Sequence, residues 1–229
     1  MLLMSFFCLL HSSAGCRDRA EVASIQGDRP LYREERIRYP CHGRRARDSV
    51  RYLRPDGSVL GSKIIGWRPD QLRPDFELRM DSPLERVSVK WRGDTARIEL
   101  ERQNVSRTYD VQVPPGTVVD AGIDVWIVEN LPRLATGGSL DVPLLVPEFH
   151  RVIWFSAKAT ANEAGRPNRV LIELKPRNWL LGALTTPLVA GYDAQTGSLT
   201  DFTGVSDLKD REGRNFKVRM RYGGWRSID

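Results

Sequence analysis

Cysteine is scarce in this chain, whose 229 residues include only Cys8, Cys16 and Cys41. Three cysteines cannot form the framework of a small disulfide-rich protein or supply a four-thiolate zinc site. Beyond the first ten residues, no apolar run approaches the roughly 20 residues that a membrane-spanning helix requires. A disulfide scaffold and a polytopic helical membrane protein are therefore excluded, and a hydrophobic content of 41% suits a single globular domain.

The sequence also lacks the common catalytic and nucleotide-binding motifs. It contains no Walker loop, no Gly-x-Ser-x-Gly elbow, no Gly-x-Gly-x-x-Gly and no His-Glu-x-x-His. His42 and His150 lie far apart in the sequence and have no nearby set of metal ligands. His42 directly follows Cys41, and adjacent strand residues point to opposite faces, which disfavours a thiol and base pair. We therefore expect a non-enzymatic protein with no catalytic residues, no metal and no cofactor.

Lysine is rare beside arginine, and the basic residues are dispersed. The formal net charge of +6 could suit nucleic acid, because lysine and arginine neutralise phosphates. Only six of the 35 basic residues are lysines, and the 29 arginines are scattered among carboxylates. The one local concentration is Arg44, Arg45 and Arg47. We expect no nucleic-acid partner, and instead a basic surface that makes peripheral contact with an anionic membrane.

The N-terminus has the pattern of an export signal. Residues 1–10 read MLLMSFFCLL, small residues follow, and the first charges appear at residues 17–19. This order is typical of a secretory signal peptide. We predict a signal peptide over residues 1–15 and a location in the periplasm.

Two fates of Cys16 remain open. Residues 13–16 (SAGC) resemble a bacterial lipobox, in which Cys16 would be lipidated and would anchor the protein to the inner or outer membrane. An ordinary signal peptidase could instead cut after the small residues 12–14. A retained Cys16 thiol could then form a bridge to Cys41 in an oxidising compartment.

Short alternating segments separated by turn residues predict antiparallel strands in most of the chain. Residues 49–53 and 59–67 flank Pro-Asp-Gly at 55–57, which indicates a hairpin. Residues 85–91 and 96–101 alternate strictly around a second turn at 92–95. Further strands are predicted over residues 139–146, 150–160, 168–175, 188–193, 199–205 and 215–222. We assign residues 16–28 to a polar lead or tether and residues 29–229 to a single β-rich domain.

One segment departs from the strand pattern. Over residues 117–131 the apolar side chains fall at helical spacing, at Val119, Ile123, Trp126, Ile127 and Leu131. Thr117 and Asp120 suggest a capping box, and Pro132 should end or kink the helix. The expected fold class is mainly β: a strongly curved antiparallel sheet, either a half-barrel or a two-sheet roll, of about ten to twelve strands packed around this one main helix.

Residues 178–187 (NWLLGALTTP) also interrupt the strand pattern. Asn178 could cap a short helix that carries Trp179, Leu180 and Leu181. This apolar segment could form the lip of a cavity, a loop that touches a membrane, or a crossover packed in the core.

The order of these features resembles a family of uncharacterised bacterial envelope proteins, periplasmic proteins or lipoproteins with a domain of unknown function. The resemblance covers roughly residues 28–222. It rests on residues 31–35 (LYREE), 55–57 (PDG), 120–124 (DAGID), 178–181 (NWLL), 192–196 (YDAQT) and 204–208 (GVSDL). At the level of fold it implies a distant similarity to the lipoprotein carriers of the Lol system, in which a strongly curved antiparallel sheet wraps helices and shelters acyl chains.

This resemblance and the residues together lead to two functional hypotheses. The first is a monomeric, non-enzymatic envelope protein that binds or carries an apolar ligand, of acyl or lipid type, between the curved sheet and helix 117–131. The candidate ligand-binding residues are Ile123, Trp126, Ile127, Trp154, Trp179, Leu180 and Leu181. The alternative is a periplasmic structural or interaction module with a filled core, no ligand and an envelope protein as its partner.

Overall fold

The computed structural model describes residues 15–81, 83–160, 168–178 and 188–228, which form one large, strongly curved sheet and one α-helix. The helix is α1 (Gly122–Ala135), and a short 3-10 helix, η1, spans Pro147–Phe149. The strands are β1 (Cys16–Ser24), β2 (Pro30–Tyr39), β3 (Arg47–Leu53), β4 (Val59–Gly66), β5 (Asp75–Asp81), β6 (Leu84–Arg92), β7 (Thr95–Arg102), β8 (Val105–Gln112), β9 (Val118–Val119), β10 (Ser139–Val146), β11 (Arg151–Thr160), β12 (Arg169–Pro176), β13 (Leu188–Asp193), β14 (Leu199–Lys209), β15 (Asn215–Tyr222) and β16 (Arg226–Ser227). Among the described residues, no helix is both long and apolar enough to span a membrane.

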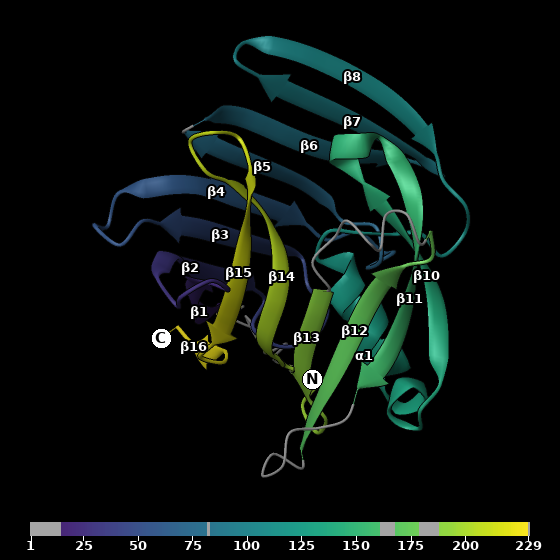
Figure 1. Cartoon of the computed structure of the whole chain (residues 1–229). Helices are drawn as coiled ribbons and strands as arrows, with labels where there is room; N and C mark the ends of the chain where they lie inside the picture. Colours follow the sequence, from purple (N-terminus) through teal and green to yellow (C-terminus); the bar gives the residue numbers. More distant parts are fainter. Residues whose placement is uncertain (1–14, 82, 161–167, 179–187, 229) are drawn as a thin grey trace, which may run out of the picture.

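The sheet is built almost entirely from neighbouring hairpins. The strand order is β8-β7-β6-β5-β4-β3-β2-β1-β15-β14-β13-β12-β11-β10-β9, with β16 paired to β1. Only β9 and β10 pair in parallel among the described strands. The two ends of the order, β8 and β9, do not pair with each other, so the sheet curls without closing (Figure 1). The expected mainly β class and curved antiparallel sheet are therefore confirmed.

The predicted number of strands was too low, since the described residues form sixteen. The two predicted hairpins are present as β3–β4 and β6–β7. In the first, Gly57 takes a φ of 86°, which a glycine adopts without steric cost. The strands that the sequence pattern missed are β1, β2, β5, β8, β9 and β16.

Residues 16–28 are not a free tether, because β1 occupies Cys16–Ser24 and lies between β2 and β15. Alternate side chains of this strand are buried, among them Asp18, Ala20 and Val22. The prediction failed because the outward positions are charged and one of the inward positions is Asp18, so that the segment reads as polar.

Cys16 forms a disulfide with Cys41, and their Cα atoms lie 4.7 Å apart. The bridge joins the start of β1 to the segment that follows β2. One sulfur cannot carry both a disulfide and a thioether-linked lipid, so the bridged and lipidated forms of Cys16 are alternatives. Lipidation of Cys16 stays a prediction, and the predicted signal peptide lies, apart from Gly15, outside the described residues.

The helix begins five residues later than predicted and continues past Pro132. Val118 and Val119 are fully buried and pair with β10 as β9, and Asp120 takes a positive φ of 46°, so a helix cannot run through these positions. The expected capping box is absent because the Thr117 hydroxyl donates to the carbonyl of Pro114. Beyond Pro132, burial of Leu134 holds the last turn against the sheet.

Two apolar clusters fill the concave side of the sheet. The first includes Phe76, Leu78 and Val89 of the N-terminal strands and reaches β9, β10, β14 and β15 through Val119, Leu145, Leu208, Val218 and Met220. The second, which we call the α1 cluster, packs the helix against β10–β13. Its buried members are Val118, Ile127, Leu131, Leu134, Val142, Phe155, Ala157, Val170, Ile172, Leu174, Ala190 and Tyr192.

The end of β14 passes over the concave face of the N-terminal strands, as the yellow β14–β15 hairpin in front of β4 and β5 shows (Figure 1). We call residues 206–209 and their partners the β14 crossing. Ser206 contacts Tyr32 on β2, Asp207 contacts Lys63 on β4, and Lys209 contacts Glu85 on β6. The crossing therefore fixes the distance between the two halves of the curved sheet.

Candidate functional site

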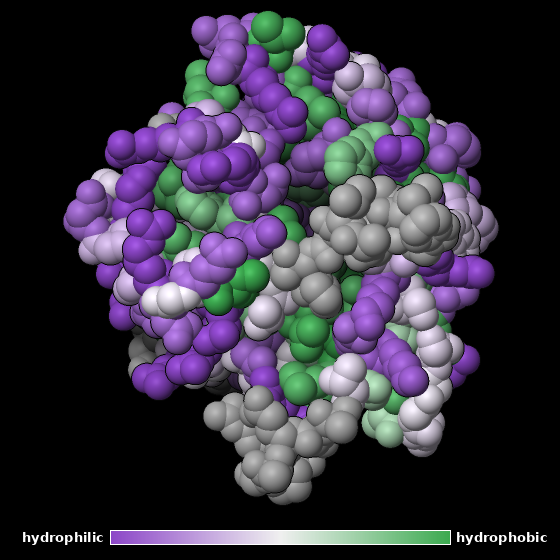
Figure 2. Space-filling view, in the orientation of Figure 1, coloured by the Kyte–Doolittle hydropathy of each residue, from purple (hydrophilic) through white to green (hydrophobic). Residues whose placement is uncertain are grey.

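A cavity of about 310 Å³ lies between the concave face of the sheet and α1. This volume is at the lower end of the range for small-molecule sites, about 300–1,000 Å³. Apolar side chains from both sides line it: Val50, Ile65, Phe76 and Leu78 from β3–β5, and Ile123, Ile127, Leu144, Leu174 and Ala190 from α1 and β10–β13. In the space-filling view, hydrophobic residues gather near the centre of this face, between hydrophilic residues on either side (Figure 2).

The charged groups of the cavity wall are mainly acidic. Five carboxylic acids line the cavity, namely Glu34, Asp120, Asp124, Glu148 and Asp207. Only two basic side chains, Arg36 and Lys63, lie among them. A chain with a net charge of +6 therefore surrounds a cavity whose charged groups carry an excess of acid.

Lys63 binds two of these carboxylates. Its ammonium lies 2.5 Å from Asp120 Oδ2 and 2.8 Å from Asp207 Oδ2, and its side chain is only 8% exposed. Burial alone would lower the pKa of Lys63, but the two carboxylates more than offset burial and hold this pKa well above its usual value. The Lys63 charge in turn lowers the pKa of Asp207. Lys63 is thus a fixed cation whose charge is already balanced.

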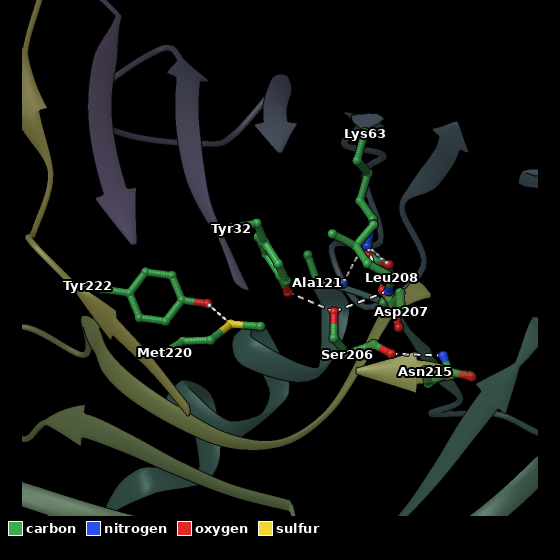
Figure 3. Close-up of polar contacts among 10 residues, drawn as sticks. Tyr32, Lys63, Ala121, Ser206, Asp207, Leu208, Asn215, Met220 and Tyr222 are labelled. Atoms are coloured by element: carbon green, nitrogen blue, oxygen red, sulfur yellow. Dashed lines mark hydrogen bonds and ion pairs between the residues drawn. The ribbon is translucent and has the colours of Figure 1, made fainter. Parts of the chain in front are cut away.

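Beside the Lys63 ion pairs, the β14 crossing also contains hydrogen bonds between uncharged groups (Figure 3). The hydroxyl groups of Tyr32 and Ser206 lie 2.8 Å apart, and the Asn215 side chain donates to the Ser206 carbonyl at 2.8 Å. Further along, the Lys209 ammonium lies 2.6 Å from one oxygen of the buried Glu85 carboxylate and 2.7 Å from the other. Asn215 begins the neighbouring strand β15, whereas Tyr32 and Glu85 come from strands remote in sequence from their partners on β14.

Glu34 differs from the other acids of the cavity wall. It lies on β2 with its side chain on the concave face, and only 8% of the residue is exposed. Among the described residues, no side chain or backbone group donates a hydrogen bond to its carboxyl group, and none forms an ion pair with it. Burial raises the pKa of Glu34, and the charges of Arg36 and Lys63 offset this effect only in part.

Arg36 lies two residues further along β2 and lines the same cavity. Its guanidinium stacks over the ring of Tyr222 at 5.0 Å and over that of Trp225 at 5.1 Å. It also lines a second cavity of about 270 Å³, between β2 and the helix. On the helix side, the Tyr192 hydroxyl donates to Asp124 Oδ1 at 2.6 Å and ties β13 to α1.

The predicted ligand-binding residues fall into three groups: those that line the cavity, those that lie outside it, and those outside the described residues. Ile123 and Ile127 line the cavity, as expected for the inner face of the helix. Trp126 packs against the α1 cluster without lining the cavity. Trp154 is 44% exposed, on the face of β11 opposite the buried Phe155, so it lies outside the cavity. Trp179, Leu180 and Leu181 lie outside the described residues.

The sequence pattern missed the polar residues of the site. Glu34 and Arg36 lie in a strand that is charged on both faces (residues 31–38 read LYREERIR), so the pattern does not indicate which side chains point inward. Lys63 belongs to a predicted strand, but its partners Asp120 and Asp207 are 57 and 144 residues away. The one signal in the sequence is Lys63 itself, a charged residue on the inward side of a predicted strand, which indicates that a carboxylate partner should lie nearby.

Comparisons with known proteins bear on the fold alone. No protein-family model and no curated protein matches the chain. The chain is similar to a crystal structure described as a beta-barrel-like protein of a domain of unknown function, DUF1849, from Brucella abortus. The TM-score is 0.51 at 11% sequence identity, and the match covers 94% of this chain and 98% of the other. The expected relation to a domain of unknown function is therefore supported, while the Lol carriers and a cell location are not part of this likeness.

Proposed function

We propose that this protein binds an apolar ligand, of acyl or lipid type, in the cavity between the curved sheet and α1. The observation that carries the proposal is the cavity itself, which is lined on both sides by apolar side chains and opens between the two halves of the sheet. Removing apolar ligand surface from water would favour binding by about 25 cal/mol for each Å². The protein would act as a carrier or binding protein rather than as an enzyme.

A location in the periplasm accompanies this proposal. The export pattern over residues 1–15 supports it, and so does the Cys16–Cys41 bridge, because disulfides persist in oxidising compartments. The basic exterior would favour contact with anionic lipid. Metabolic labelling with palmitate, compared between the native chain and Cys16→Ala, tests whether a fraction is lipid-anchored.

Binding can be tested with an uncharged fluorescent apolar probe and the purified mature protein. We expect the probe to bind at micromolar concentrations, and Ile123→Trp to weaken its binding at least about tenfold, because the larger ring would occupy the cavity at a partly buried position. Trp154→Ala is the matched control, since Trp154 lies on the outer face of β11. Equal binding by the native protein and a correctly folded Ile123→Trp variant would place the ligand elsewhere.

Native mass spectrometry provides an independent measurement. Protein purified from its own envelope without detergent should carry a bound apolar molecule. A protein that carries none and binds no probe would instead favour the interaction module with a filled core.

A further inference from the structure

We infer that the ligand of this cavity carries a cationic group, an ammonium, which binds at Glu34 while the apolar part of the ligand packs against α1. The inference rests on the proposed function and names the chemical class of the ligand. It follows from three features of the cavity wall: a buried carboxyl group without a partner, cations that are already engaged, and aromatic rings beside them.

The first feature is the isolation of Glu34. Its neighbours across the sheet on β1 and β3 are Ala20 and Tyr52, and it is more than nine-tenths buried at the cavity wall. A buried carboxyl group without a hydrogen-bond donor is costly, and native proteins usually supply a partner. None of the described residues supplies one here. A donor or cation brought by a ligand would fill this place.

The second feature is that the basic groups of the wall are occupied. Lys63 is held between Asp120 and Asp207. Arg36 stacks on the rings of Tyr222 and Trp225, and its guanidinium lies 4.0 Å from Asp18 Oδ2. An anionic ligand would therefore meet a wall with five acids and two cations that already have partners, whereas a cation would meet an unpaired carboxyl group.

The third feature is aromatic. The rings of Tyr52, Tyr192 and Tyr222 line the same cavity. The face of an aromatic ring attracts an ammonium, and carboxylates combined with aromatic rings are suited to alkylammonium groups. A free fatty acid, the other amphiphile that suits an acyl-binding cavity, would bring its carboxylate next to Glu34 and be repelled.

The experiment compares three amphiphiles of one chain length: dodecylammonium, dodecanol and dodecanoate. Each is used below the concentration at which it forms micelles, and each displaces the uncharged probe from the purified protein at neutral pH. We expect dodecylammonium to bind roughly tenfold or more tightly than dodecanol, as a hydrogen bond to a charged group would give, and dodecanoate to bind most weakly.

Two variants assign the preference to one residue. Glu34→Gln keeps the size of the side chain and should abolish most of the preference for dodecylammonium while leaving the affinity for dodecanol nearly unchanged. Glu35→Gln is the matched control, because Glu35 is the next residue on β2 and faces outward beside Arg19 and Arg33. It should leave all three affinities unchanged.

The outcomes separate this inference from the function on which it rests. If dodecanol and the probe bind but dodecylammonium binds no better, the cationic ligand is wrong and the apolar cavity stands. The inference also fails if Glu34→Gln retains the full preference for dodecylammonium. If none of the three amphiphiles binds, both the inference and the proposed function fail. The ranking in the native protein tests the inference even if Glu34→Gln does not fold.

Discussion

The β14 crossing and the α1 cluster hold the two sides of the same cavity by different means. The crossing is held by polar contacts in which each group has a defined partner, such as the buried Lys63 with Asp120 and Asp207. The α1 cluster joins the helix to β10–β13 through apolar packing, in which one side chain touches several others. Apolar packing tolerates exchange of similar residues, whereas a buried ion pair fails when either partner is removed. Substitutions in the two regions should therefore differ in their effect on stability.

The largest effect is expected where the crossing loses a charge. Lys63→Met removes the cation between Asp120 and Asp207 and leaves Asp120 buried and unpaired, which should lower the free energy of unfolding by about 3–5 kcal/mol. Urea denaturation measures this loss. Lys175→Met is the control, because Lys175 forms an exposed pair with Glu173 that should contribute no more than about 1 kcal/mol. The double variant Lys63→Met/Asp120→Asn should recover part of the loss. Equal losses in the two single variants would contradict the contrast.

A smaller loss is expected when the α1 cluster loses volume. Ile127 is 1% exposed and lies in the middle of the helix, so Ile127→Ala should destabilise the protein by about 2–5 kcal/mol. Ile64→Ala, at a position 43% exposed on the outer face of β4, should change stability by less than about 0.5 kcal/mol. Thermal unfolding distinguishes the two. Conservative Ile127→Leu should cost less than about 1.5 kcal/mol, since the cluster tolerates a swap of equal volume.

Glu34 should make stability depend on pH in the direction opposite to a typical paired carboxylate. The pKa of Glu34 is raised by folding, so the folded protein holds this proton more tightly, and the stability due to Glu34 is complete below the usual pKa of 4.5 and is lost as pH rises through the higher folded value. The groups that act on Glu34 are Arg36, Lys63, Asp207 and Asp18.

Replacing Glu34 removes this dependence. Glu34→Gln should be more stable than the native protein at pH 8 by about 1–3 kcal/mol, the usual cost of leaving a buried polar group unpaired. The difference should shrink toward pH 4.5 in urea titrations. A native protein that gains stability through this window relative to Glu34→Gln would show that Glu34 has a strong partner.

The smallest effect concerns the polar contact within the α1 cluster. Tyr192→Phe removes the hydroxyl that donates to Asp124 and should cost about 0.5–1.5 kcal/mol. Tyr109→Phe is the control, because the Tyr109 hydroxyl has no hydrogen-bond partner among the described residues and its ring, stacked on His150, is retained. Differential scanning calorimetry should show a lower melting temperature for Tyr192→Phe alone.

The sequence predicts the parts of this fold that depend on local pattern. Strict alternation located β6 and β7, and turn residues located the β3–β4 and β6–β7 hairpins. Helical spacing placed Ile123 and Ile127 on the face of the helix that lines the cavity. The helix start was wrong because tertiary pairing of Val118 and Val119 with β10 outweighs their place in the apolar stripe.

The polar side of the site could not be predicted for a physical reason. An inward charge usually needs a partner, and the partners of Lys63 and Glu85 on β14 lie far along the chain. The inward positions of β1 and β2 include Asp18, Glu34 and Arg36. The local sequence pattern therefore predicts that these two segments are exposed to solvent. β8 was missed for a different reason, because it is an edge strand whose first half is exposed on both faces, and only Tyr109 and Val111 in its second half are partly buried.

The position of β1 in the sheet determines when, during synthesis, its second neighbouring strand becomes available. β2 is made directly after β1, but the other neighbour, β15, comes from residues 215–222 and is made much later. While the chain is being made, β1 therefore has one edge without a hydrogen-bonding partner, and such an edge can recruit other chains. The outward side chains Arg17, Arg19 and Glu21 provide the charges that oppose this recruitment until the last hairpin arrives.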